Sequence, residues 1–320
     1  FFFAQKCRVF EGISPQPMRH AHARCRGCER CKRVVTPASL AQDVRLHGVL
    51  GQPMLDLEPY IGAVDWDAVD AEIRLALTKC ELDWCGEQMK STNWIHPSAL
   101  EGYVDAKDVI AGFGPEEFAA FLKLSDDIDV NSFDLNHPEQ YSMGSQTRIP
   151  FSRKQVDYLK YRYGVRFDWI CYSLMPNVSE LLDPGAPGSR HPDFTAEVRA
   201  LFPKTLELIR ALPLSSVFQC TIFAVDAHVL PVLHRDCGSD EQCSRDPHHY
   251  VLLVPGGDLR QFVCDKALTQ KHYGPSRAFW FNDHDYHGTE ADPFFRYSIQ
   301  VNGHFDPSFF AQLAMRSKSG

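Results

Sequence analysis

Residues 202–236 read FPKTLELIRALPLSSVFQCTIFAVDAHVLPVLHRD, and this stretch joins a short helix, a long strand and a group of polar side chains. Pro203 suits the first turn of a helix, and Leu206 and Ile209 follow it at helical spacing. The run Val217–Val225 alternates in the manner of a half-buried strand. One face of this expected strand consists of Phe218, Cys220, Ile222 and Ala224. The stretch therefore predicts a helix that leads directly into a sheet.

Short strands without intervening helices are expected to follow residue 236. They are Tyr250–Val254, Gln261–Cys264, Ala278–Phe281 and Tyr297–Val301. Turn signals separate them: Pro255-Gly256-Gly257, Gly274-Pro275 and Asn302-Gly303. This succession predicts an antiparallel barrel or jelly roll, here a cupin-like double-stranded β-helix.

The chain before residue 196 has a helical pattern. Apolar residues recur at helical spacing at Val69, Ile73, Leu77 and Cys80, and again at Val156, Leu159 and Tyr163. Pro115 with two following glutamates indicates a helix start, Gly164 a helix end, and Leu182–Pro192 a loop. We expect a mainly β fold with a helical N-terminal half, an α+β arrangement. The expected parts are a basic, Cys-rich segment (1–50), a helix-rich region (51–195), a β-helix core (196–310) and a tail (311–320).

Composition limits the classes of function. Of the 320 residues, 44% are apolar and 23% charged, as in ordinary globular proteins. A net charge of -8 and a pI of about 5.9 argue against a general affinity for nucleic acid or anionic membranes. No apolar run approaches the roughly 20 residues of a membrane helix. Most of the eleven cysteines are scattered through globular sequence, which favours a reducing, cytoplasmic compartment.

Four cysteines near the start of the chain lie among arginines and lysines: Cys7, Cys25, Cys28 and Cys31. They could form a structural zinc site, with His20 and His22 as further candidate ligands. Their spacing departs from that of known zinc knuckles, and no Cys-Pro follows as in an iron–sulfur run. The alternative is a basic segment with reduced thiols.

A candidate metal site begins at residues 233–236 (LHRD). On an extended strand His234 and Asp236 point to one face and Arg235 to the other, so an imidazole and a carboxylate can meet one ion. His287 supplies a third ligand from a later part of the predicted barrel. Two histidines and one carboxylate with open positions form the ligand set of non-haem Fe(II) oxygenases. A His-x-Asp pair alone also occurs on surface turns.

Arg296 and Ser298 strengthen the interpretation. They come shortly after His287 and share one face of an expected strand. A guanidinium fork beside a hydroxyl is a good receptor for a carboxylate. A dicarboxylate held at one end by this pair could chelate a metal with its other end.

These motifs resemble the Fe(II)/2-oxoglutarate-dependent dioxygenases, and residues 202–236 are similar to the aspartyl/asparaginyl β-hydroxylase-like branch, which includes free-proline hydroxylases. The resemblance covers about residues 200–303. It implies that His234, Asp236 and His287 bind iron and serve as the catalytic centre. Arg296 and Ser298 would bind 2-oxoglutarate, with His249 close to the co-substrate. An arginine of the family pattern is replaced here by Pro247, which leaves one co-substrate contact without a counterpart.

The resemblance also implies a reaction. Halogenating relatives lack the carboxylate present here as Asp236, so hydroxylation of an unactivated C–H bond is expected, with release of succinate and CO2. The substrate would be an amino acid, a peptidyl side chain or a small natural product. His284 competes with His287 as the third ligand, and the spacing to Arg296 favours His287. The alternative is a cupin-like metal-binding protein, a sensor or a zinc-dependent enzyme, without 2-oxoglutarate chemistry.

Overall fold

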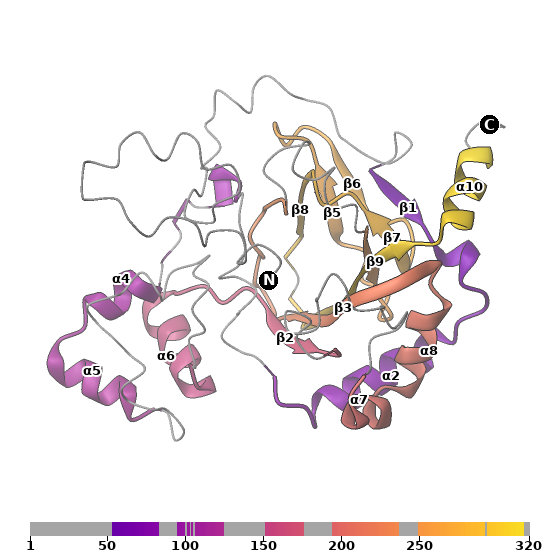
Figure 1. Cartoon of the computed structure of the whole chain (residues 1–320). Coiled ribbons are helices and arrows are strands. Elements are labelled where there is room, and N and C mark those ends of the chain that lie inside the picture. Colours follow the sequence, from indigo (N-terminus) through magenta and orange to yellow (C-terminus); the bar gives the residue numbers. More distant parts are fainter. Residues whose placement is uncertain are drawn as a thin grey trace, which may run out of the picture.

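The computed structural model describes residues 53–82, 95–99, 101–102, 104, 106–124, 151–175, 194–236, 249–291 and 293–316. These residues form two antiparallel sheets and several helices, an α+β arrangement (Figure 1). The cysteine-rich segment and the expected loop at 182–192 lie outside this part of the chain. Among the described residues, no helix combines the length and the apolar character needed to cross a membrane.

The larger sheet has six strands in the order β1-β7-β4-β9-β3-β2. Their bounds are β1 Met54–Asp56, β2 Ile170–Ser173, β3 Leu214–Val225, β4 His249–Leu253, β7 Ala278–Phe281 and β9 Arg296–Phe305. The longest pairing joins β3 to β9, from Leu214 opposite Phe305 to Val225 opposite Arg296. Neither strand lies at an edge of the sheet, and the pair carries several polar side chains.

The smaller sheet has the order β6-β5-β8 and packs on one face of the larger one. Its strands are β5 Gln261–Cys264, β6 Lys271–Tyr273 and β8 Tyr286–Thr289. Strand β8 is an edge of this sheet, and there the backbone of His234 pairs with that of His287 in an isolated antiparallel bridge. Val263 of β5 is buried against Leu252 and Phe279 of the larger sheet. We call this side of the larger sheet its inner face.

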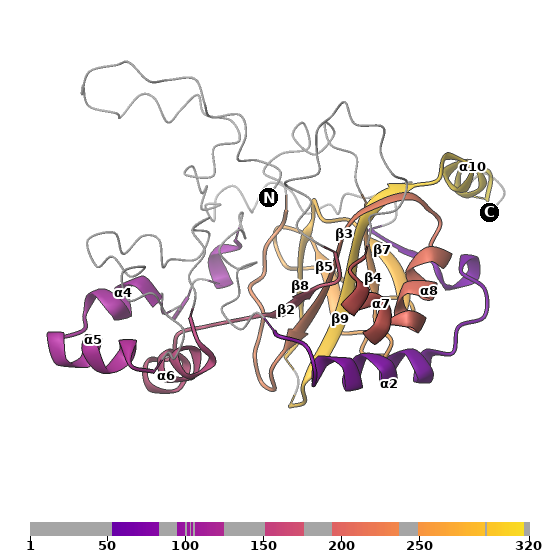
Figure 2. The ribbon, with the colours of Figure 1, turned by 60° about the horizontal axis from the view of Figure 1, so that its bottom comes forward.

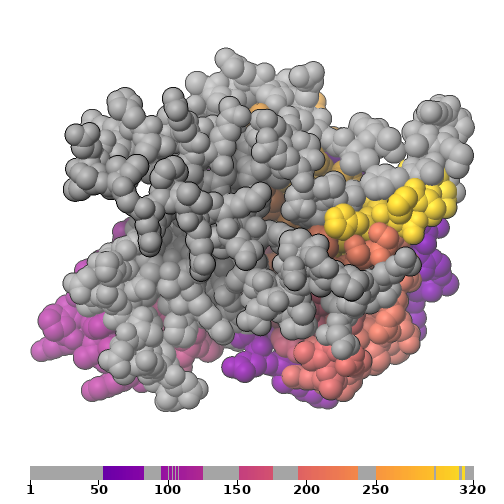
Figure 3. Space-filling view, in the orientation of Figure 1, coloured from indigo at the N-terminus to yellow at the C-terminus, as the bar shows by residue number. Residues whose placement is uncertain are grey.

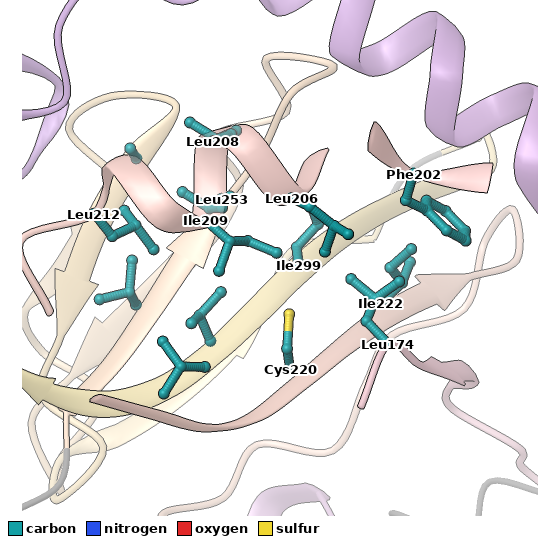
Figure 4. Packing of buried hydrophobic residues seen from close by; sticks show 14 of the residues in the cluster. Leu174, Phe202, Leu206, Leu208, Ile209, Leu212, Cys220, Ile222, Leu253 and Ile299 are labelled. Atoms are coloured by element: carbon teal, nitrogen blue, oxygen red, sulfur yellow. The ribbon is translucent and has the colours of Figure 1, made fainter. Parts of the chain in front are cut away.

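Helices cover the opposite, outer face of the larger sheet (Figure 2). They are α2 Trp66–Leu77, α7 Ala196–Leu201, α8 Pro203–Ala211 and, at the C-terminal end, α10 Pro307–Arg316. Figure 4 shows α8 lying across the strands, with Leu206 and Ile209 above Cys220, Ile222 and Ile299. Burial of such side chains contributes about 1.5–3 kcal/mol each. The apolar face of β3 thus packs against the apolar face of α8.

A second helical group has its own small core. Helices α4 Ala106–Ala111, α5 Pro115–Leu122 and α6 Arg153–Tyr163 pack around the buried Ile110, Phe121 and Leu159. Ser152 and Gln155 form a capping box at the start of α6, and Gly164 ends it in the left-handed conformation. The short helical turns Glu58–Tyr60 and Pro97–Ala99 complete the set. Figure 3 shows α4 and α5 on the opposite side of the molecule from α7 and α8.

Several expectations from the sequence are confirmed and a few are wrong. Strands β5 and β7 have the predicted bounds. The expected turn at Asn302-Gly303 lies inside β9, where Gly303 is required because a Cβ there would be 2.2 Å from the carbonyl oxygen of Ser216. A register shift between Val217 and Gln219 replaces Phe218 by Val217 on the outer face. Helix α10 crosses the expected boundary between core and tail.

Candidate metal centre

His234, Asp236 and His287 come together between the two sheets. One ligand atom from each lies within 4.8 Å of the others. Nε2 of His234 is 3.5 Å from Oδ1 of Asp236, and Nε2 of His287 is 3.9 Å from Oδ2. The three side chains are 13%, 29% and 6% exposed, so the carboxylate is the most accessible. The arrangement is a group of the right composition and size to hold one metal ion.

Both imidazole rings are oriented by a backbone carbonyl. Nδ1 of His234 lies 2.8 Å from the carbonyl oxygen of Val232, and Nδ1 of His287 lies 3.1 Å from that of Asp285. Donation of the Nδ1 hydrogen to these oxygens leaves the Nε2 lone pair free and aimed at Asp236. Metal-binding histidines in proteins are held in this manner. The strand bridge between His234 and His287 fixes the two backbones relative to each other.

Asp168, which the sequence analysis missed, fixes the carbonyl that orients His234. Its carboxylate accepts a 2.8 Å hydrogen bond from the backbone N–H of Val232 and pairs with Arg166 at 3.2 Å. Its side chain is fully buried, and burial raises the pKa of this carboxyl despite the arginine. No local motif marks Asp168, because it lies 64 residues before Val232 in the chain.

The loop before β8 holds His287 and Asp236 in a similar way. The amide of Asn282 donates to the carboxylate of Asp285 at 3.1 Å, and the N–H of Asp285 donates to the carbonyl of Asn282. The N–H of Asp236 donates to the carbonyl of Asp283 at 3.0 Å. Burial and the charge of Asp236 raise the pKa of the Asp283 carboxyl. The loop therefore positions two of the three candidate ligands through backbone contacts.

Burial also determines the charge of His287. Burial and, to a lesser extent, the neighbouring His234 together lower the pKa of this imidazole to about 4. The ring of His287 packs at 5.0 Å against the ring of Phe281 on β7. A neutral imidazole at neutral pH is the protonation state that a metal ligand requires.

Arg296 lies on the inner face of the larger sheet with part of its hydrogen-bonding capacity unused. Its Nη1 is 3.8 Å from Asp258, whose carboxylate is already bound by two hydrogen bonds of 2.7 Å from Arg260. Its Nε is buried and has no hydrogen-bond partner among the described residues. Burial lowers the pKa of Arg296 to about 10, so the guanidinium is charged at neutral pH. Two arginines share one carboxylate, which leaves a positive charge available for an anion.

Ser298 is two residues from Arg296 on the same face, as the alternation predicts. Among the described residues its hydroxyl has no hydrogen-bond partner. Ser298 pairs with Phe223, whose ring contacts Trp169 at 6.4 Å, and Trp169 contacts the ring of His234 at 5.6 Å. Two ring contacts therefore connect the position of Ser298 with the metal group. No hydrogen bond or ion pair within the described part of the chain joins Arg296 to the triad.

The backbone of His249, the residue expected close to the co-substrate, pairs with Gly303, seven residues beyond Arg296. The competing ligand His284 lies outside the group that could hold a metal. As expected, Arg235 points away from the group, over the ring of Tyr286.

Comparison of the chain with known protein families and with curated proteins gave no match.

Proposed function

We propose that this protein is an Fe(II)- and 2-oxoglutarate-dependent oxygenase with a double-stranded β-helix core. The observation that carries the proposal is a group of two histidines and one carboxylate facing a sheet that presents a buried arginine with spare charge. Two imidazoles and a carboxylate leave coordination positions open and suit non-haem iron. A structural zinc site would normally have four protein ligands.

The strand order supports the proposed core. Eight successive segments from β3 to β9, counting the bridge at His234, divide equally between the two sheets. The larger sheet contains β3-β9-β4-β7, and the smaller one His234-β8-β5-β6. Two facing four-stranded layers of this kind are typical of jelly rolls. Strands β1 and β2 extend the larger layer at its edges.

Arg296 supports 2-oxoglutarate over other metal chemistry. A cupin-like sensor or zinc-dependent enzyme has no need for a buried cation on the facing sheet. Here Arg296 and the hydroxyl of Ser298 would bind the distal carboxylate of the co-substrate by charge-assisted hydrogen bonds. When bound, iron and 2-oxoglutarate would supply the oxidising power for C–H hydroxylation, with release of succinate and CO2. The chain's own residues hold these groups and exclude water.

The test measures metal binding and turnover in parallel. The protein is loaded anaerobically with Fe(II), and succinate release from 2-oxoglutarate is followed with air admitted. His287→Ala should lose both tight metal binding and succinate release, and so should Asp236→Ala. His284→Ala is the matched control, because His284 lies three residues away but outside the metal group. Tight metal binding without 2-oxoglutarate binding in the wild type would favour the cupin-like alternative and overturn the proposal.

A further inference from the structure

A row of uncharged polar side chains runs along the inner face of β3 and β9. Thr221 pairs with Gln300, and Gln219 pairs with Asn302. Gln300 and Asn302 continue the alternation that begins with Arg296 and Ser298. On the same face, the neighbouring β4 has the apolar Leu252 opposite Gln300, whereas β2 has Ser173 opposite Thr221. Polar side chains are thus concentrated on this half of the face.

One contact shows which row of paired residues in the larger sheet lies against His287. The ring of His287 packs against Phe281. Phe281 pairs with Tyr250, and Tyr250 pairs with Asn302. The row of the larger sheet that touches His287 is therefore the row of Asn302.

A second series of contacts connects His234 with a row nearer to Arg296. His234 contacts Trp169, Trp169 contacts Phe223, and Phe223 pairs with Ser298. The metal group therefore contacts the larger sheet in the row of Asn302 and, through Trp169, near the row of Ser298. Gln300 and Thr221 form the row between these two.

Hydrogen bonds within the row leave two groups unused. Asn302 donates to Gln219 at 2.7 Å, and Gln300 donates to Asn302 at 3.4 Å. Within the described residues, the amide oxygen of Gln300 accepts no hydrogen bond. The hydroxyl of Thr221 is buried, with 1% of the residue exposed, and has no hydrogen-bond partner in the described part of the chain. An unpaired buried hydroxyl costs free energy unless a bound molecule pairs with it.

We propose that Gln300 and Thr221 bind an amide group of the substrate beside the metal, a proposal that rests on the proposed function. The free oxygen of Gln300 would accept the N–H of one amide, and the hydroxyl of Thr221 would donate to the carbonyl of the adjacent amide. Residues directly opposite each other on two strands have Cβ atoms about 5 Å apart, so both can reach neighbouring groups of one ligand. Arg296 is the only charged side chain on this face of β3 and β9. The pair therefore favours an amide-bearing compound over a free zwitterionic amino acid.

The experiment compares two sets of probes on protein loaded with Zn(II) and 2-oxoglutarate, which does not turn over. One set is a panel of N-acetyl amino acid N-methylamides, and the other contains the corresponding free amino acids. Binding is followed by ligand-observed NMR and calorimetry. We expect members of the blocked set to bind more tightly than their free counterparts. Thr221→Val and Gln300→Leu should each weaken that binding about 2- to 12-fold, the effect of one neutral hydrogen bond.

Ser216→Ala is the matched control, because it removes another hydroxyl from β3 at the far end of the strand, where Ser216 contacts His304. It should leave probe binding unchanged. The proposal is overturned if only free amino acids bind, if no blocked amide binds, or if Thr221→Val and Gln300→Leu bind the amides as the wild type does. Metal and 2-oxoglutarate binding are measured on the same wild-type sample. Failure of those two measurements refutes the proposed function, and failure of amide binding alone refutes only this inference.

Discussion

Arg296 combines burial with a shared counterion, and this combination determines what it can bind. Its partner Asp258 is held by Arg260 through two short hydrogen bonds, so Arg296 interacts with it only at 3.8 Å. Burial alone would raise the pKa of Asp258, but the hydrogen bonds from Arg260 and the charge of Arg296 hold it below its ordinary value. The carboxylate therefore stays ionised and neutralises one of the two arginines. The remaining charge attracts a ligand carboxylate.

The first prediction concerns this charge. Arg296→Ala should raise the half-saturating concentration of 2-oxoglutarate about 10- to 150-fold, because a hydrogen bond to a charged group contributes about 1.5–3 kcal/mol. Arg296→Lys should have a smaller effect, since it keeps the charge but loses the planar fork. Titration of the metal-loaded protein with 2-oxoglutarate measures the change. Arg277→Ala is the control, because Arg277 lies over Trp66 away from the site. Equal half-saturation in Arg296→Ala and wild type would remove Arg296 from the binding site.

Asp168 does not belong to the metal group but positions one of its residues, His234. It fixes the N–H of Val232, and the carbonyl of the same residue orients the ring of His234. Residues that support metal ligands in this way typically change metal affinity about 10- to 100-fold when mutated.

The second prediction tests this chain of contacts. Asp168→Ala leaves the Val232 N–H buried and unpaired, so it should weaken metal binding about 10- to 100-fold and destabilise the metal-free fold by about 1–3 kcal/mol. Asp168→Asn keeps an oxygen acceptor and should restore most of the metal affinity. The absorption spectrum of Co(II)-loaded protein reports ligand geometry independently of stability. If Asp168→Ala loses stability but keeps the wild-type Co(II) spectrum and affinity, Asp168 has only a structural role.

At the scale of elements, the pairing of β3 with β9 depends on a close approach of two backbones. Gly303 lies opposite the irregularity in β3, where its Cα faces the carbonyl oxygen of Ser216. A Cβ at this position would lie 2.2 Å from that oxygen, and a strand backbone at the centre of the sheet has little freedom to move.

The third prediction follows from this contact. Gly303→Ala should destabilise the fold by about 1–3 kcal/mol or more, because the strands must separate to admit the methyl group. Urea unfolding followed by circular dichroism measures the loss. Gly114→Ala provides the comparison, since a Cβ at Gly114 would meet no atom within 4 Å. Equal midpoints for the two variants would show that the strands accommodate the methyl group.

Prediction from sequence succeeds where local pattern and burial agree. Strands β5 and β7 are short apolar runs between turns, and the structure gives them the predicted bounds. Strand β8 was missed, because its sequence YHGT contains a glycine and carries the ligand His287 in place of an apolar residue. Asn302-Gly303 resembles a turn locally, but the tertiary contact with Ser216 decides its conformation. The three metal-group residues follow from spacing, whereas Asp168 depends on a contact across 64 residues that no local pattern reveals.

At the scale of the whole molecule, the helices of the described part of the chain pack into two separate hydrophobic cores. The core under α2, α7 and α8 includes the outer face of the larger sheet, and the core of α4, α5 and α6 is separate from it. Lys160 of α6 pairs with Asp226, just after β3, at 2.9 Å. The metal group belongs to neither helical core, because its residues lie on the inner side, at the edge of the smaller sheet. Metal binding should therefore stabilise the molecule unevenly.

The fourth prediction concerns this distribution and uses hydrogen exchange with mass spectrometry. Protein treated with a chelator is compared with protein loaded with Zn(II), which should bind the same three side chains without turnover. Binding to the folded state alone lowers the population of local openings that break the site. Amides in residues 232–236 and 285–289 should exchange more slowly after loading. The backbone N–H of His234 donates to the carbonyl of His287, and that of His287 donates to the carbonyl of His234, so a metal that holds both side chains also holds this bridge.

Amides in α4, α5 and α6 should exchange at the same rate in both states, since their core contains no residue of the metal group. The control is His287→Ala, in which Zn(II) should give no added protection at residues 232–236. Protection that spreads equally over α4–α6 would mean that the two cores open together, and that metal binding is coupled to the whole fold. Protection absent from residues 232–236 and 285–289 in the wild type would show that the metal does not bind between His234 and His287.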